Sequence, residues 1–159
     1  MTEHSSDADD AKATLYLRLE GPLQSWGGRT IGRFRRTETV PTKSGVIGLL
    51  GAGLGLTRTQ LNDRLDELND LTMTVRVDRS GTIEEDYQTV GAKIGVLAAD
   101  GRIKKTAGTG EVEPIISPRE YLMDASFLVI LQGDNDLIHE LAVALQNPKW
   151  PLFLGRKRC

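Results

Sequence analysis

One glycine-rich loop carries both aromatic and cationic side chains, the two kinds that contact unpaired nucleic acid. Trp26 and Phe34 lie there among four arginines: Arg29, Arg33, Arg35 and Arg36. Bases stack on aromatic rings and guanidinium planes, and guanidinium groups also pair with phosphates. The loop, which includes Gly27, therefore indicates a nucleic-acid contact. A solvated loop with no partner is the alternative, because most runs of charge are simply exposed to water.

A second candidate site lies at the start of a predicted helix. Lys43 and Ser44 follow Thr42 there, and backbone amides at a helix N-terminus can hold a phosphate together with a lysine. An ordinary helix cap with a surface lysine is the alternative. The glycine-rich run that follows is not a P-loop, because it lies inside the helix and no Gly-Lys-Ser/Thr comes after it.

The sequence is poor in residues that serve catalysis or metal binding. His4 and His139 are its two histidines, and Cys159 is its one cysteine. RNA cleavage without a metal normally uses a histidine as general acid or base, although a tyrosine or lysine can replace it. No carboxylates are paired at a spacing that suggests metal binding. The sequence therefore favours binding without chemistry, with no cofactor and no metal.

The net charge of −2 conceals two opposed blocks of charge. Residues 18–58 hold seven basic and two acidic residues, whereas residues 60–86 hold three basic and eight acidic residues. This pattern indicates a basic face for a polyanion and an acidic face for another partner. Two solvated faces without partners are the alternative.

Length and composition are those of one globular domain. The chain has 159 residues, of which 39% are hydrophobic and 26% are charged. No apolar run reaches the roughly 18 residues of a membrane span, and no membrane partner is expected. The acidic segment 1–12 is predicted to be a disordered tail, and it resembles neither a signal nor a transit peptide. We therefore expect a cytoplasmic protein.

Hydrophobic periodicity predicts an α+β domain over residues 13–159. Read in order, the elements give a ferredoxin-like (RRM-like) βαββαβ sheet with an inserted β-hairpin. An irregular loop is expected over residues 23–41, and a hairpin excursion is expected at about 82–121 with its turn at Asp100–Gly101. The predicted helices are 41–54, 59–68 and 135–146, and the predicted strands are 14–19, 71–79, 125–131 and 152–154.

The first predicted helix carries a glycine at every third position. Gly45, Gly48 and Gly51 leave one face nearly bare, so another backbone can lie very close to it. Tight packing of this helix within its own domain and close contact with a ligand both remain possible.

Five segments together resemble the CasD family, the subunit of the type I-E CRISPR surveillance complex Cascade that binds the 5′ handle of the guide. The resemblance rests on 17–27 (Leu-Arg-Leu-Glu-Gly-Pro-Leu-Gln-Ser-Trp-Gly) and 41–55 (Pro-Thr-Lys-Ser-Gly-Val-Ile-Gly-Leu-Leu-Gly-Ala-Gly-Leu-Gly). It continues through 86–92, 119–127 and 151–159. Five motifs in the family's order are far more specific than any one of them.

The resemblance implies a fold, a function and partners. It implies an RRM-like body with a thumb-like hairpin, which holds the repeat-derived 5′ handle of a CRISPR RNA and caps one end of the complex. The implied neighbours are the Cascade backbone subunit and the large subunit, with target DNA reached only through the complex. The implied role is non-catalytic. Family members continue for several tens of residues past Cys159, so the domain is expected to be truncated at its C-terminus.

Two alternatives to this function stay open. One is a metal-independent endoribonuclease that processes precursor CRISPR RNA, and the other is an adaptor that touches only protein.

The hairpin excursion supplies the remaining candidate RNA contacts. Tyr87 and Tyr121 lie near its two roots, and Lys104, Lys105 and Arg119 lie along its return strand. The basic chain end adds Arg156. We expect the hairpin, and not the acidic helix 59–68, to contact RNA, with Arg119 foremost because its guanidinium can bind a phosphate and stack on a base. A salt bridge from Arg119 to Glu120 or Glu113 is the alternative.

Overall fold

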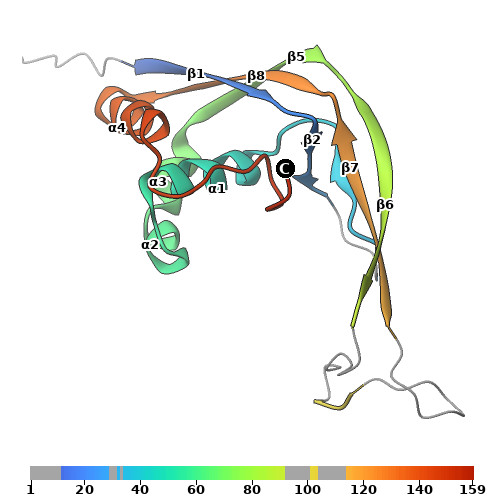
Figure 1. Cartoon of the computed structure of the whole chain (residues 1–159). Coiled ribbons are helices and arrows are strands. Elements are labelled where there is room, and N and C mark those ends of the chain that lie inside the picture. Colours follow the sequence, from blue (N-terminus) through green and yellow to red (C-terminus); the bar gives the residue numbers. More distant parts are fainter. Residues whose placement is uncertain (1–11, 29–31, 33, 92–100, 104–113) are drawn as a thin grey trace, which may run out of the picture.

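A computed structural model describes residues 12–28, 32, 34–91, 101–103 and 114–159 (Figure 1). The predicted α+β class is confirmed. Strand β1 (Lys12–Glu20) begins at the last residue of the predicted tail, and the rest of that tail lies outside the described residues. In the described part of the chain, no helix is long and apolar enough to cross a membrane.

Three antiparallel strands form the main sheet in the order β1–β8–β5. The predicted buried strand is its centre, β8 (Ser126–Asp134), and β5 (Thr72–Arg79) is the far edge. Alternate residues of β1 and β8 face the core together, because residues opposite each other share one face of the sheet. Leu19 lies opposite Phe127 in this way, and both are buried.

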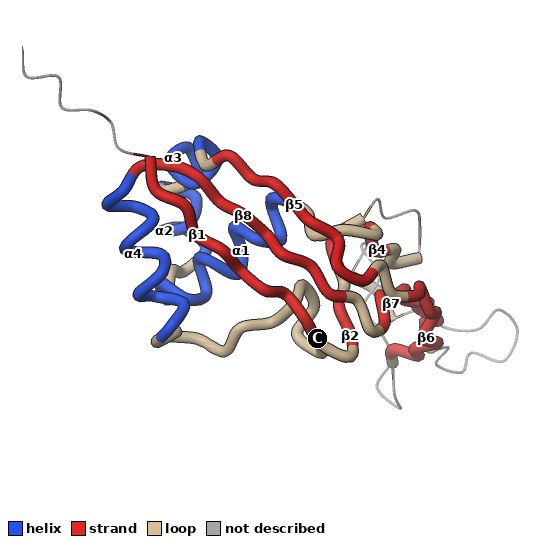
Figure 2. Tube along the Cα trace, turned by 90° about the horizontal axis from the view of Figure 1, so that it is seen from above, coloured by secondary structure: helices blue, strands red, loops and turns tan. Residues whose placement is uncertain are grey.

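Helices cover one face of the main sheet (Figure 2). Helix α1 (Lys43–Leu54) begins after Thr42, whose hydroxyl accepts a hydrogen bond from the Gly45 amide at 3.3 Å. Helix α4 (Asn135–Gln146) is capped by Asp134, whose carboxylate accepts from two amides at 3.0 Å. These two caps stabilise the helix starts by occupying amides that have no partner within the helix.

A second sheet, in the order β2–β7–β6, carries the hairpin. Its long arms, β6 (Thr82–Val90) and β7 (Ile115–Met123), extend away from the helices (Figure 1). Of the hairpin tip between residues 91 and 114 the structure describes only 101–103, so Lys104, Lys105 and the predicted turn residue Asp100 lie outside the described residues.

The predicted irregular loop is wrong as stated, because it contains short strands. They are β2 (Leu23–Gln24), β3 (Trp26–Gly27) and β4 (Thr37–Glu38), and β3 pairs with β4. Two-residue strands leave no periodic pattern in a sequence, so only the fold reveals them.

Two further element predictions need correction. The single helix 59–68 is two short helices, α2 (Arg58–Asp63) and α3 (Leu65–Asp70), interrupted at Arg64. The Arg64 guanidinium bonds both carboxylate oxygens of Glu140 at 2.8–2.9 Å, which ties this break to α4. The final strand at 152–154 does not form: the Leu154 carbonyl accepts one hydrogen bond, from the Ser25 amide at 2.9 Å, and the chain then turns at Gly155.

Candidate nucleic-acid interface

The fold brings four of the predicted site residues together around one hollow of about 380 Å³. Gly27 comes from β3, Arg35 from the segment before β4, Ser44 from the first turn of α1, and Arg156 from the chain end. Arg36 lines it too. We call this cavity the arginine hollow. Its lining residues come from four separate parts of the chain, so no local sequence motif predicts the cavity.

Backbone hydrogen bonds hold the arginine segment against the hairpin root. The Arg35 amide donates to the Pro118 carbonyl at 3.0 Å, and the Glu120 amide donates to the Arg35 carbonyl at 2.9 Å. Arg35 thereby forms a parallel bridge with Arg119 of β7. The exposed Arg35 guanidinium has no ion-pair partner within the described ranges, whereas Arg36 lies 3.9 Å from the Glu120 carboxylate.

Trp26 is a core residue and does not offer its ring to a base. Its side chain is fully buried, and its indole N–H donates to the Gln24 side-chain oxygen at 2.9 Å. Gln24 in turn donates to the Ala125 carbonyl at 2.8 Å. The stacking role expected for Trp26 is therefore corrected: a buried indole needs a hydrogen-bond partner, and the fold supplies one inside.

Arg156 and Tyr121 contact each other and other parts of the same chain. The Arg156 guanidinium donates to the Glu120 and Arg35 carbonyls, each at 2.7 Å, and lies 5.1 Å from the centre of the Tyr121 ring. Tyr121 is buried. Arg156 therefore fastens the chain end to β7 and to the arginine segment, and the ring of Tyr121 is covered and not available for stacking.

We expect Arg156→Ala to lower the free energy of unfolding by about 2 kcal/mol, because charge-assisted hydrogen bonds to two carbonyls are lost. Arg156→Lys should restore less than half of this loss, since one ammonium group cannot reproduce the planar fork. Urea denaturation measures both variants, with Lys157→Ala as the exposed control. Equal stability of the Arg156→Ala and Lys157→Ala variants would contradict the fastening role.

Lys43 points to a different part of the molecule from the one expected. Its ammonium group donates to the Asn69 carbonyl near the end of α3. Carbonyls in the last turn of a helix lack helical partners and attract cations. In this geometry Lys43 does not line the arginine hollow. The Gly45 and Val46 amides bond to Thr42, so the Ser44 hydroxyl and amide remain as the candidate anion ligands at this helix start.

The other two predicted site residues on the hairpin arms, Tyr87 and Arg119, differ in their exposure and in their contacts. Tyr87 is 63% exposed on β6, opposite Pro118. Arg119 lies opposite Asp86, and its Nε is buried without a hydrogen-bond partner in the described structure. The alternative salt bridge to Glu120 is not formed, since that carboxylate accepts instead from the Thr37 amide at 3.2 Å and lies near Arg36. Outside the described residues are Glu113, Arg29, Arg33, Lys104 and Lys105.

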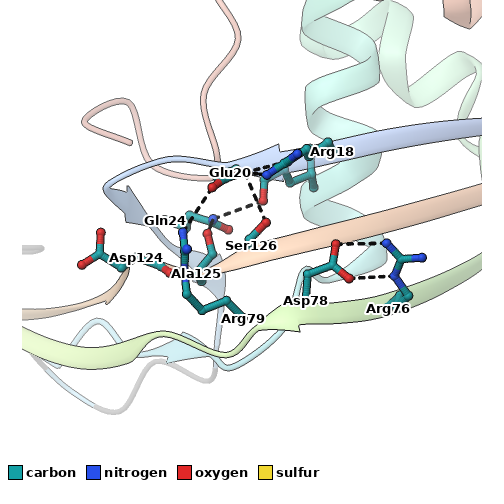
Figure 3. Close-up of polar contacts among 10 residues, drawn as sticks. Arg18, Glu20, Gln24, Arg76, Asp78, Arg79, Asp124, Ala125 and Ser126 are labelled. Atoms are coloured by element: carbon teal, nitrogen blue, oxygen red, sulfur yellow. Dashed lines mark hydrogen bonds and ion pairs between the residues drawn. The ribbon is translucent and has the colours of Figure 1, made fainter.

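The neck between the two sheets is held by one charged network (Figure 3). Arg79 donates to the Asp124 carbonyl and pairs with the Glu20 carboxylate at 3.2 Å, thereby joining the two bends through which the hairpin arms leave the main sheet. Glu20 also accepts from Arg18 at 2.6 Å and from the Ser126 hydroxyl at 3.3 Å. The hydrogen bond from Arg18 holds the pKa of the Glu20 carboxyl below its usual value, so the network stays charged near neutral pH.

Several lining residues escaped the sequence reasoning. Ser25 and Gly155 line the arginine hollow, and Phe153 lines an adjoining one. The only signal was indirect: Ser25 and Gly155 both lie within segments that resemble the CasD family, and neither residue type alone marks a site.

Together these features define the class of protein: an α+β protein whose two antiparallel sheets are joined by short bends, from β5 to β6 and from β7 to β8, with a cationic hollow beside the root of a long hairpin. Residues 14–159 match the family model described as CRISPR-associated protein (Cas_Cas5). The chain belongs to this family.

Two kinds of relative agree with the family. The curated protein "CRISPR system Cascade subunit CasD" of Escherichia coli (strain K12) is 36% identical over 160 residues, which cover 93% of this chain and 67% of that protein. A solved chain of a "CRISPR RNA-guided surveillance complex" has a TM-score of 0.76 at 35% identity, covering 92% of this chain and 58% of the other. A "Cas protein" crystal structure has a TM-score of 0.63 at 39% identity, covering 91% and 57%. The chain thus spans less than two thirds of the length of both solved relatives.

Proposed function

We propose that this protein is an RNA-binding subunit of a Cascade-type CRISPR surveillance complex and that it holds the 5′ handle of the guide RNA. One observation carries the proposal: the fold gathers Arg35, Arg36 and the first turn of α1 around a single hollow beside the hairpin root. Guanidinium groups and free helix amides both bind phosphate oxygens. The names of the relatives, a Cascade subunit and an RNA-guided complex, supply the RNA.

The exposed hairpin arm adds a second kind of contact. Tyr87 presents its ring to solvent, and unpaired bases stack on such rings. A handle that is single-stranded and bent exposes base edges that a paired A-form helix hides. The hollow and the hairpin therefore suit an unpaired RNA segment better than a duplex.

Salt dependence tests the arginine hollow. We expect Arg35→Ala and Arg36→Ala each to lower the slope of log affinity against log salt by about 0.7, the value for one phosphate contact on single-stranded RNA. The measurement is guide-RNA binding by the purified protein at several salt concentrations. Arg58→Ala, at an exposed position of α2, is the matched control. An unchanged slope in both hollow variants would place the RNA elsewhere.

The proposed partners follow from the relatives. Other Cascade subunits are expected beside this one, specifically the backbone subunit repeated along the guide and the large subunit, with target DNA reached only through the complex. The complex acts in the cytoplasm, where guide and invading nucleic acid meet.

The proposed role is non-catalytic. His139, the histidine within the described ranges, is exposed on α4 and does not line the arginine hollow. We expect labelled repeat RNA to remain intact with the purified protein, both with and without a chelator, on a denaturing gel. Discrete products that survive the chelator and disappear in the Tyr87→Phe variant would instead identify a metal-independent endoribonuclease.

The finer fold assignment belongs to the same proposal. The order β1–β8–β5, with α1 between β1 and β5 and α4 after β8, supports a ferredoxin-like (RRM-like) plan. The β6–β7 arms would be its thumb-like hairpin.

A further inference from the structure

Gly48 is the one glycine of the α1 face that meets nothing in the described structure. A Cβ at Gly45 would lie 2.9 Å from the Trp26 ring, and a Cβ at Gly51 would lie 2.9 Å from the Leu61 side chain. A Cβ at Gly48 would have no heavy atom within 4 Å. Glycine destabilises a helix interior relative to alanine, so packing explains the first two glycines, whereas Gly48 has no such packing contact among the described residues.

The open position faces a cavity of about 320 Å³ between α1 and the chain end. Its lining includes Gly48, Leu49 and Ala52 on one side and Pro151 and Phe153 on the other. We call it the α1 hollow. It adjoins the arginine hollow, since Ser44, Gly45 and Gly155 line both cavities.

A buried hydroxyl at the same place lacks a partner. Ser25 lines the arginine hollow and is only 3% exposed, and its Oγ makes no hydrogen bond within the part of the chain that the structure describes. Buried polar groups are nearly always satisfied. Because this oxygen has almost no exposed surface, a ligand atom in the arginine hollow would reach it only after the Ser25 side chain rotates.

We propose that the two hollows together form a subsite for one nucleotide of single-stranded RNA. The phosphate lies by Arg35 and the first turn of α1, and the base enters the α1 hollow against the Gly48 backbone and the Phe153 ring. This inference rests on the proposed function, which supplies the RNA. An apolar side chain from a neighbouring subunit would fill the α1 hollow alone and leave the exposed Arg35 guanidinium without a partner, so a nucleotide fits the two hollows better.

Gly48→Leu tests the subsite without disturbing the fold. The new side chain has open space, so thermal stability should be unchanged or higher, while the base can no longer enter. The probe is guide RNA containing photoreactive thionucleosides, crosslinked in the assembled complex and mapped by mass spectrometry. Trypsin releases residues 44–58 and 150–156 as the two peptides that contain the α1 hollow. Gln146→Leu, on the exposed end of α4, is the matched control.

We expect crosslinks to these two peptides in the wild type, and an approximately tenfold loss of them in the Gly48→Leu variant, equivalent to about 1.4 kcal/mol. Crosslinks to the hairpin should stay unchanged, as should all crosslinks in the Gln146→Leu variant. Crosslinks to residues 44–58 and 150–156 that persist in the Gly48→Leu variant would overturn the subsite and leave the proposed function standing. Loss of a neighbouring subunit with these crosslinks intact would show that the α1 hollow holds protein. No crosslink anywhere on this chain would overturn the proposed function as well.

Discussion

Replacing Gly155 with alanine is expected to release the chain end and to lower the free energy of unfolding by about 4 kcal/mol. A Cβ at Gly155 would lie 1.7 Å from the Ser25 carbonyl oxygen, and the residue has φ of +99°. The backbone around Ser25 cannot move away easily, because its amide is bonded to the Leu154 carbonyl. Both hollows lose a wall in this variant, so RNA binding should fall together with stability. Urea denaturation and guide-RNA binding measure the two effects.

The Gly101→Ala variant is the control that measures the cost of backbone strain without a steric clash. Gly101 also has a left-handed backbone, with φ of +77°, but a Cβ there would meet no atom of the described residues within 4 Å. We expect it to cost only about 1 kcal/mol, which is the strain alone. Equal losses for the two alanine variants would show that the chain end is not docked on Ser25 as the structure has it.

Truncating Trp26 to alanine is expected to cost about 3–5 kcal/mol of unfolding free energy. The indole is fully buried and forms part of the hydrophobic core, against the glycine face of α1. Trp26→Phe should keep most of the packing but leave the Gln24 side-chain oxygen without its donor, at a cost of about 1–3 kcal/mol. Thermal and urea denaturation measure both variants.

Phe34→Ala is the matched control for the aromatic loop. Phe34 is 48% exposed, so its removal should change stability by no more than about 0.5 kcal/mol. An RNA-binding loss in this variant, with stability retained, would identify Phe34 as the stacking aromatic of the loop. If instead Trp26→Ala folds as stably as Phe34→Ala, the core position of Trp26 is wrong and its stacking role returns.

The neck network gives the hairpin a defined direction. Both hairpin arms follow main-sheet strands after short bends. Arg79 links the two bends by donating to the Asp124 carbonyl, and it also pairs with Glu20 at the end of β1. A hairpin that holds RNA must keep a constant orientation to the hollow at its root. The network supplies this with side chains that lie outside every predicted RNA contact.

The main elements could be read from the sequence, because they follow local rules. Alternating leucines over 14–19 predict a half-buried strand, and the spacing of Leu137, Ile138 and Leu141 predicts the inner face of α4, which the structure confirms. The caps at Thr42 and Asp134 follow from residues within a few positions of each helix start. The gathering of cationic residues near one loop was also visible as a local excess of arginine.

Only the tertiary structure decided which of these side chains face outward. Trp26 and Phe34 are both aromatic residues of the same loop. Trp26 bonds Gln24 and packs against the glycine face of α1, whereas Phe34 is exposed. Arg35 and Arg156 carry the same side chain, but of the two only the Arg156 guanidinium donates hydrogen bonds to backbone carbonyls within the described structure. The reason is physical: periodicity along the chain sets a residue's local conformation, whereas its contacts come from other elements, such as the Arg35 carbonyl 121 residues before Arg156, and their positions depend on the packing of the whole fold.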